Sequence, residues 1–127
     1  MTDVREVMST DLVTVDPAVN VTDAVTIMSK HATGSALVLD SGTLVGIFTE
    51  RDVLRALVES PSADAARVSP VSAWMTRDPV TIGPETSVGD ALNEMLFRGF
   101  RHLPVVEGGA VVGMVSMRDL AESVARA

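Results

Sequence analysis

Two short motifs place a hydroxyl group three residues ahead of a carboxylate, at Thr49-x-x-Asp52 and at Ser116-x-x-Asp119. A carboxylate in such a position can accept hydrogen bonds from two neighbouring hydroxyl groups of a ligand. The same spacing forms a capping box at the start of a helix, and the chain uses it again at Asn20-x-x-Asp23 and Ser87-x-x-Asp90. Spacing alone therefore favours helix capping, although one carboxylate can serve both roles.

The other reactive residue types argue against catalysis. The two histidines, His31 and His102, stand in no metal-binding or Ser-His-Asp pattern, and the absence of cysteine excludes disulfides, thiolate zinc sites and Cys nucleophiles. The net charge is −7, and the ten Lys and Arg residues are scattered singly, which disfavours nucleic acid as a partner. We therefore expect a binding protein without enzymatic activity or a metal site.

Composition sets the size and the setting of the fold that must position these motifs. With 127 residues, 46% of them hydrophobic, the chain can form one compact module, and its single Trp and absence of Tyr leave the core to aliphatic side chains. No apolar run approaches the length of a spanning helix, and acidic residues appear early in the chain. We expect a cytoplasmic protein that does not contact membranes.

The chain contains an internal repeat, since residues 4–55 align without a gap with residues 71–122 at a constant offset of 67. Met8 and Met75, Pro17 and Pro84, and the pairs Arg51-Asp52 and Arg118-Asp119 are among the identities. The segment between the copies is polar and contains prolines at both ends. We expect a first repeat at 1–58, a linker at 59–70 and a second repeat at 71–127, all in one compact module.

Each copy has the pattern β-α-β-β-α. A short strand at 12–15 (79–82 in the second copy) precedes an amphipathic helix with a 3.6-residue apolar period, and two apolar runs around Ser41-Gly42 or Gly108-Gly109 form a hairpin. The Thr49 and Ser116 motifs open the last helices. The fold class is α/β (α+β), and because one copy is too small to fold alone, we expect the sheets to pair with pseudo-twofold symmetry and to form two clefts.

These motifs in this order resemble the CBS-domain pair, or Bateman module. The resemblance is carried twice by Met-Ser/Thr-x-Asp-x-Val-Thr-Val/Ile-x-Pro, by Val-x-Asp-Ala-x-x-x-Met, and by Gly-Ile-Phe-Thr-x-Arg-Asp or Gly-Met-Val-Ser-x-Arg-Asp, and once by the strand Arg101-His102-Leu103-Pro104-Val105-Val106. It implies a regulatory module that binds an adenosine-containing ligand, with AMP, ADP or ATP favoured and S-adenosylmethionine as a further candidate. It implies no required cofactor.

The resemblance implies a ligand site for each repeat. In the second repeat, Asp119 with Ser116 would bind the ribose, Arg101 and His102 the phosphate, and main chain of the opposite copy the base; Gly34 would let a ring approach the backbone, or would instead cap the preceding helix. The residues implied are Ser116, Asp119, Arg101, His102, Thr10, Leu12, Val13, Thr33, Gly34, Met114 and Val115.

The site implied for the first repeat is weaker, because Gly34 and Ser35 stand where the second repeat has Arg101 and His102. His31 is a partial substitute. Arg51 and Arg118 could reach a phosphate or pair with nearby acids, and we favour pairing. The implied residues are Thr49, Asp52, Arg77, Pro79, Val80, Ile47 and Phe48.

The sequence thus predicts a stand-alone energy or metabolite sensor that forms a homodimer and acts on a client protein that the sequence does not identify. The alternative is a dimerisation or protein-interaction module that binds no ligand. A homodimer is expected because small modules of this kind leave apolar helix surface exposed.

Overall fold

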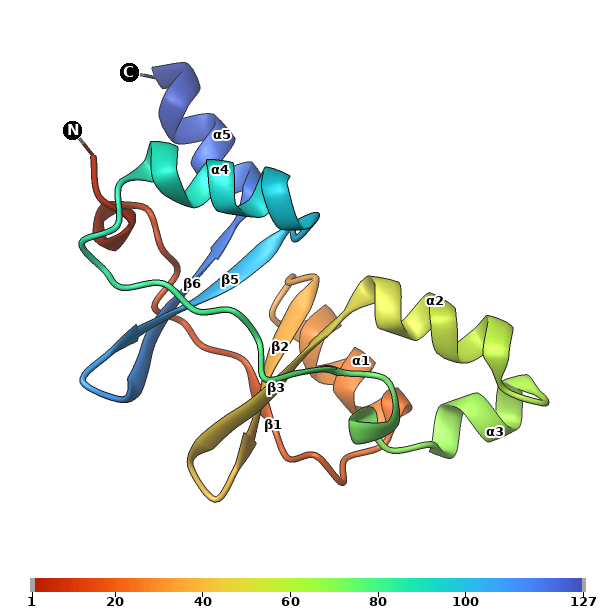
Figure 1. Ribbon diagram of the computed structural model, residues 1–127. Helices are drawn as coiled ribbons and strands as arrows, with labels where there is room; N and C mark the ends of the chain where they lie inside the picture. The colour runs from red at the N-terminus through yellow and green to blue at the C-terminus, as the bar shows by residue number, and fades with distance from the viewer. Residues whose placement is uncertain (1, 127) are drawn as a thin grey trace. The chain divides into compact units, whose positions relative to one another are not determined.

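The computed structural model describes residues 2–126, which divide into two compact units. Unit 2 runs from Val13 to Pro79, and unit 1 combines the described residues up to Leu12 with those from Val80 onward. Both units mix strands and helices, as the sequence predicted (Figure 1).

Unit 2 is a four-stranded sheet with three helices. The strands are β1 (Thr14–Val15), β2 (Ser35–Asp40), β3 (Thr43–Thr49) and β4 (Thr76–Arg77), in the order β1-β2-β3-β4, and only the β1–β2 pair is parallel. The helices are α1 (Val21–Lys30), α2 (Glu50–Glu59) and α3 (Ala63–Val68), followed by the short 3-10 helix η2 (Val71–Ala73). Helix α3 contacts both α1 and α2.

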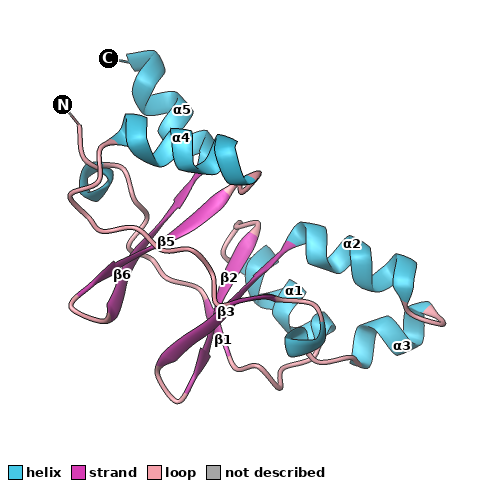
Figure 2. Ribbon diagram, viewed as in Figure 1, coloured by secondary structure: helices cyan, strands magenta, loops and turns pink. Residues whose placement is uncertain are grey.

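Unit 1 is built on the hairpin β5 (His102–Glu107) and β6 (Ala110–Ser116), with helices α4 (Val88–Arg98) and α5 (Met117–Arg126) side by side and the 3-10 helix η1 (Val4–Glu6) (Figure 2). The expected strand at 79–82 is only a single bridge, from Ile82 to Val105. In unit 2 the amide of Leu37 donates to the carbonyl of Val13 at 2.8 Å, but Pro104 stands at the position equivalent to Leu37 and has no N–H.

The helices and turns follow the local signals. Asn20 caps α1 by accepting from the Asp23 amide at 2.8 Å, and Ser87 caps α4 by accepting from the Asp90 amide at 3.1 Å. The apolar period of each helix faces a core, with Val21, Ala24 and Met28 buried in unit 2 and Val88, Ala91 and Met95 buried in unit 1. The expected helices are therefore confirmed.

Two local details go beyond what the sequence indicated. The segment predicted as a linker contains a helix of its own, α3, because Ser62 caps it by accepting from the Ala65 amide at 3.0 Å and because Ala66 is buried. Gly34 does not cap α1, since the left-handed residue after that helix is Ala32, with φ of 51°. Gly99 (φ 73°) occupies the equivalent position after α4.

The opening segment of each repeat packs on the hairpin of the other repeat. Thr76 and Arg77 pair with β3, and Ser9 forms a bridge with Met114 of β6. At the crossing points Met75 lies on Gly46 and Met8 lies on Gly113, where a Cβ atom on the glycine would be 2.9 Å and 2.8 Å from the methionine Cγ atoms. The compact units therefore differ from the sequence repeats by these exchanged segments.

Candidate functional site

The Ser116-x-x-Asp119 motif lies where β6 runs directly into α5. The Ser116 amide donates to Asp119 Oδ2 at 3.2 Å, and the Asp119 amide donates to Ser116 Oγ at 3.1 Å. This is the reciprocal capping box that the spacing predicted. Both residues are half-buried, and no Lys or Arg in the described chain forms an ion pair with Asp119. The cap engages Oδ2, which leaves Oδ1 of the carboxylate to accept from a ligand.

The equivalent carboxylate of unit 2 is closed off. Asp52 is only 4% exposed, and its Oδ2 accepts from the Thr49 amide at 2.9 Å and from the Thr49 hydroxyl at 3.3 Å. Its Oδ1 accepts from Arg55 Nη1 at 3.4 Å. Burial raises the pKa of Asp52, against the lowering effect of the Thr49 hydrogen bonds and of Arg55. Both oxygens are therefore occupied by the protein.

Arg55 is held over the ring of Trp74, with its guanidinium carbon 5.9 Å from the ring centroid. Its Nη1 also donates to the Trp74 carbonyl at 3.3 Å, and its Nε donates to Glu59 at 3.4 Å. The indole N–H donates to Ser69 Oγ at 2.8 Å, which fixes the ring. Sequence analysis did not identify this group of residues. The repeat alignment did contain a signal for it, since Trp74 and Arg55 align with the different residues Val7 and Glu122.

The expected phosphate-binding positions lie against the first turns of the last helices. The Met117 amide of α5 donates to the Arg101 carbonyl at 2.8 Å, and His102 pairs with Ser116 across the hairpin. In unit 2 the Glu50 amide donates to the Gly34 carbonyl at 3.0 Å, and the Glu50 carboxylate lies over Gly34. The first repeat thus has an acid where the second has Met117, in addition to lacking the arginine.

The remaining predicted residues divide between the units. Unit 1 contains Thr10, Leu12, Met114 and Val115 of the second-repeat site, while Val13, Thr33 and Gly34 belong to unit 2. Unit 2 contains all the predicted residues of the first-repeat site except Val80, and those are Ile47, Phe48, Thr49, Asp52, Arg77 and Pro79. The Phe48 and Val115 side chains are fully buried in the two cores, so these two residues can offer a ligand only main-chain groups.

Ser9 of the opening segment exchanges two hydrogen bonds with Met114, at 2.8 Å and 3.0 Å, which ties the segment carrying Thr10 and Leu12 to β6.

Arg51 and Arg118 are exposed, and neither forms an ion pair among the described residues, so the favoured pairing with nearby acids was wrong. Each is therefore an exposed cation in the first turn of the last helix of its repeat, α2 for Arg51 and α5 for Arg118.

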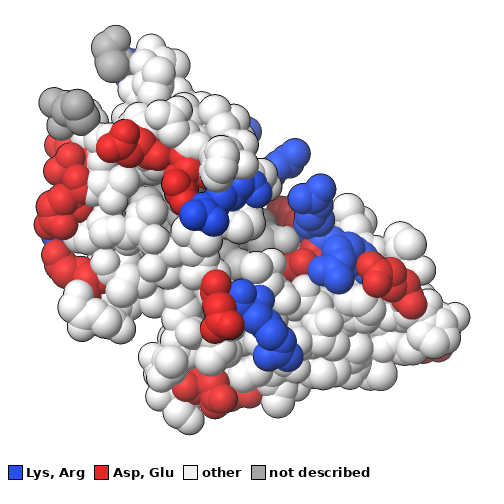
Figure 3. Space-filling model, viewed as in Figure 1, with Lys and Arg blue, Asp and Glu red and all other residues white. Residues whose placement is uncertain are grey.

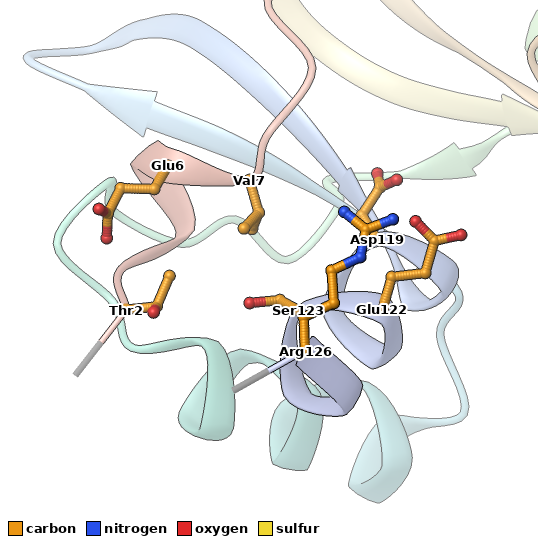
Figure 4. Close-up of a pocket in the computed structure, with 7 residues that line it drawn as sticks. All are labelled: Thr2, Glu6, Val7, Asp119, Glu122, Ser123 and Arg126. Atoms are coloured by element: carbon orange, nitrogen blue, oxygen red, sulfur yellow. The ribbon is translucent and has the colours of Figure 1, made fainter.

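A pocket of about 420 Å³ opens on unit 1 between α5 and the N-terminal segment (Figure 4). It is lined by Asp119, Glu122, Ser123 and Arg126 of α5 and by Thr2, Glu6 and Val7. Figure 4 shows the Arg126 side chain extending along α5 toward Asp119. Sequence analysis did not identify the pocket, because only Asp119 among its residues lies in a recognised motif.

Acidic side chains gather on the face of unit 1 that carries the N-terminal segment (Figure 3). Arg5 bridges Glu85 at 3.1 Å and Glu107 at 2.7 Å, and these contacts raise the pKa of Arg5. Within residues 2–126 no group of His, Asp and Glu side chains is arranged to hold a metal ion. No helix of that range has the length and apolar character needed to cross a membrane.

Comparison with known proteins identifies the class of fold and site. The family model of the CBS domain matches residues 4–59 and again residues 71–126. The chain therefore belongs to the CBS-domain family and consists of two tandem CBS repeats.

Individual relatives agree with this assignment. An uncharacterized 17.7 kDa protein of Acidianus ambivalens is 40% identical over 124 residues, which cover 96% of this chain and 73% of that protein. The crystal structure of the CBS-domain-containing protein ATU1752 from Agrobacterium tumefaciens matches with a TM-score of 0.90 and 31% identity, covering 97% of this chain and 99% of the other. The CBS domain pair of protein MJ0100, in complex with 5'-methylthioadenosine and S-adenosyl-L-methionine, matches with a TM-score of 0.88 and 25% identity over 99% and 98% of the two chains.

Proposed function

We propose that this chain is a regulatory module that binds an adenosine-containing ligand, without catalysing a reaction, and that its principal site is built on Ser116 and Asp119. The observation that carries the proposal is the half-buried Asp119 carboxylate, which has one oxygen engaged by its helix cap and no ion-pair partner among the described residues. Its second oxygen can accept from ribose hydroxyls. The adenosine ligands bound by MJ0100 support this class of ligand.

A phosphorylated ligand suits the second-repeat site. Arg101 begins the hairpin beside the N-terminus of α5, where main-chain amides and the helix dipole also favour an anion. AMP, ADP or ATP would therefore bind with the phosphate toward Arg101 and His102. S-adenosylmethionine would use the same ribose contact without that phosphate contact.

The first-repeat site is proposed to be much weaker. Asp52 is buried and bonded to Thr49 and Arg55, and the Glu50 carboxylate over Gly34 would repel a phosphate. Under this proposal one ligand binds tightly per chain.

Thermal unfolding with and without ligand tests the proposal. A ligand that binds only the folded chain adds about 2.7 kcal/mol at a hundredfold excess over its Kd, so AMP, ADP, ATP or S-adenosylmethionine should raise the Tm by several degrees. Asp119→Asn should remove the shift. Asp90→Asn is the matched control, because Asp90 is also in the first turn of a helix in the same unit but outside the site. No shift with any of the four ligands at millimolar concentration would favour the alternative function.

The alternative is a protein-interaction module, and the exposed apolar side chains of the helices favour it. Phe97 is 86% exposed and Val58 is 83% exposed, and Leu54, Leu57 and Leu96 are also exposed. Single exposed apolar residues are common, but several on neighbouring helix positions indicate a contact surface. We propose that a homodimer covers them, and a client protein remains a second candidate partner. The cytoplasmic location stays a prediction.

A further inference from the structure

The pocket on α5 has an internal counterpart that shows what kind of group it accepts. At the constant offset of 67 residues, Asp119, Glu122 and Arg126 correspond to Asp52, Arg55 and Glu59. Val7 likewise corresponds to Trp74. In unit 2 this place is filled by the indole of Trp74 and by the guanidinium of Arg55. In unit 1 both groups are replaced by shorter side chains, and the pocket of about 420 Å³ lies there instead.

Unit 2 defines how a guanidinium is held at this position. Arg55 Nη1 lies 3.4 Å from Asp52 Oδ1 and 3.3 Å from the Trp74 carbonyl, and Nε lies 3.4 Å from Glu59. A guanidinium is therefore bound by two carboxylates and one main-chain carbonyl. This arrangement matches the fixed fork of donors that distinguishes arginine from lysine.

Unit 1 keeps two of the three acceptors, and its cation stands at a different position, because Arg126 replaces the acceptor Glu59. Asp119 and the main-chain carbonyl of Val7 stand where Asp52 and the Trp74 carbonyl stand in unit 2, and Glu122 adds a carboxylate in place of the arginine itself. Figure 4 shows the guanidinium of Arg126 directed toward Asp119, but within the described residues neither Asp119 nor Glu122 forms an ion pair. Glu6 is a third acid in the lining, and its Oε2 accepts from the Asp3 amide at 3.1 Å.

We propose that this pocket is a second ligand site, which binds a guanidinium group supplied from outside the chain. Two independent observations carry it: a pocket lined by three carboxylates and one arginine, and the equivalent carboxylate of the other repeat already holding a guanidinium. The replacement of the indole by Val7 leaves room for the aliphatic stem that carries the group. The source is either a small guanidino compound or an arginine side chain of a protein.

This site regulates the adenosine site, and that consequence rests on the proposed function. In unit 2 the guanidinium occupies Asp52 Oδ1, while Thr49 occupies Oδ2. A guanidinium bound in unit 1 would likewise occupy Asp119 Oδ1, the oxygen assigned to the ribose. The two ligands therefore compete for one carboxylate, and each should weaken the other by the same factor.

Binding is measured first without any nucleotide, so that its outcome does not depend on the adenosine site. The probes are agmatine, as a free guanidino compound, and N-acetylarginine amide, as a mimic of a protein side chain. Amide NMR shifts should change in a saturable way at residues 119–126 and 4–8. Glu122→Gln should weaken binding about tenfold, because it removes a charge-assisted contact. Arg126→Gln should strengthen it, because it removes a competing guanidinium.

The decisive variant copies unit 2 into unit 1. The double substitution Val7→Trp with Glu122→Arg should fill the pocket and abolish binding of both probes while the fold is kept. The reciprocal pair, Trp74→Val with Arg55→Glu, should create a second site in unit 2. Agmatine alone binding indicates a metabolite, and stronger binding of N-acetylarginine amide indicates a protein side chain.

The proposal is overturned if neither probe gives saturable shifts below about 10 mM, or if the filled variant binds as well as the original chain. Competition is measured separately, by titrating AMP in the presence of saturating probe. Probe binding without AMP binding would refute the proposed function and keep the pocket. AMP binding without probe binding would refute the guanidinium site and leave the proposed function standing.

Discussion

Removal of the Arg101 side chain is the sharpest perturbation of the proposed ligand site. We expect Arg101→Ala to weaken AMP binding and to leave adenosine binding almost unchanged, because only the phosphate would contact the guanidinium. The Arg101 main chain should not be disturbed, since its carbonyl accepts from Met117 whatever the side chain. Arg98→Ala is the matched control, because Arg98 is an arginine of the same unit that pairs with Glu94 on the surface of α4.

The magnitude follows from one charge-assisted contact. A hydrogen bond to a charged group contributes about 1.5–3 kcal/mol, which corresponds to roughly ten- to a hundredfold in Kd. Asp119→Asn should weaken AMP and adenosine alike, because both carry the ribose. Asp52→Asn should have little effect on either ligand, since Thr49 and Arg55 already occupy that carboxylate.

Isothermal titration calorimetry distinguishes these outcomes, because it measures the number of sites as well as the Kd. We expect about one tight site per chain. The first repeat should gain affinity for AMP when Glu50→Met removes the acid over Gly34, and should gain more when Gly34→Arg is added. Equal losses from Asp52→Asn and Asp119→Asn, or an unchanged AMP affinity in Arg101→Ala, would refute the unequal sites.

Two further predictions concern stability and assembly. Burial raises the pKa of Asp52 in the folded chain, so protonation of Asp52 stabilises the fold fully below the unfolded pKa, and this stabilisation is lost as pH rises through the folded pKa. The Asp52→Asn variant should therefore gain stability relative to the original chain as pH rises through the acidic range. A stability difference that stays constant with pH in chemical denaturation would contradict this. Light scattering should give twice the 13.4 kDa chain mass. Phe97→Asp should shift the equilibrium toward the monomer more than the control Lys30→Asp, which changes the equivalent position of the first repeat. A chain that is monomeric at micromolar concentration would exclude the homodimer.

The repeat allowed the helices, hairpins and caps to be predicted from sequence, because each depends on residues close together in the chain. Asn20 and Ser87 cap their helices as the spacing indicated. Whether the carboxylates of Asp52 and Asp119 are free to bind a ligand could not be predicted in this way. The capping-box pattern is identical at both aspartates, and the difference comes from Arg55, which donates to Asp52. Arg55 is in turn held by Trp74, a residue of the exchanged segment.

The exchange of opening segments depends on two glycines, and Gly113 provides a direct test of it. A Cβ atom at Gly113 would lie 2.8 Å from Met8 Cγ and 3.1 Å from Met8 Cβ, so Gly113→Val should force the N-terminal segment away from β6. Overpacking of this kind costs about 1–3 kcal/mol in the free energy of unfolding. Gly83→Val is the matched control, because a Cβ atom there meets nothing within 4 Å.

The second half of that test is a compensating substitution. Met8→Ala removes the side chain that the new valine would meet, so the double variant should lose less stability than the two single variants together predict. Because Ser9 holds Thr10 and Leu12 beside β6, Gly113→Val should also weaken adenosine binding, and Met8→Ala should restore part of it. Denaturant unfolding and calorimetry on the four chains measure both effects. Strictly additive losses would mean that Met8 and Gly113 do not form the contact that ties the N-terminal segment to the second repeat.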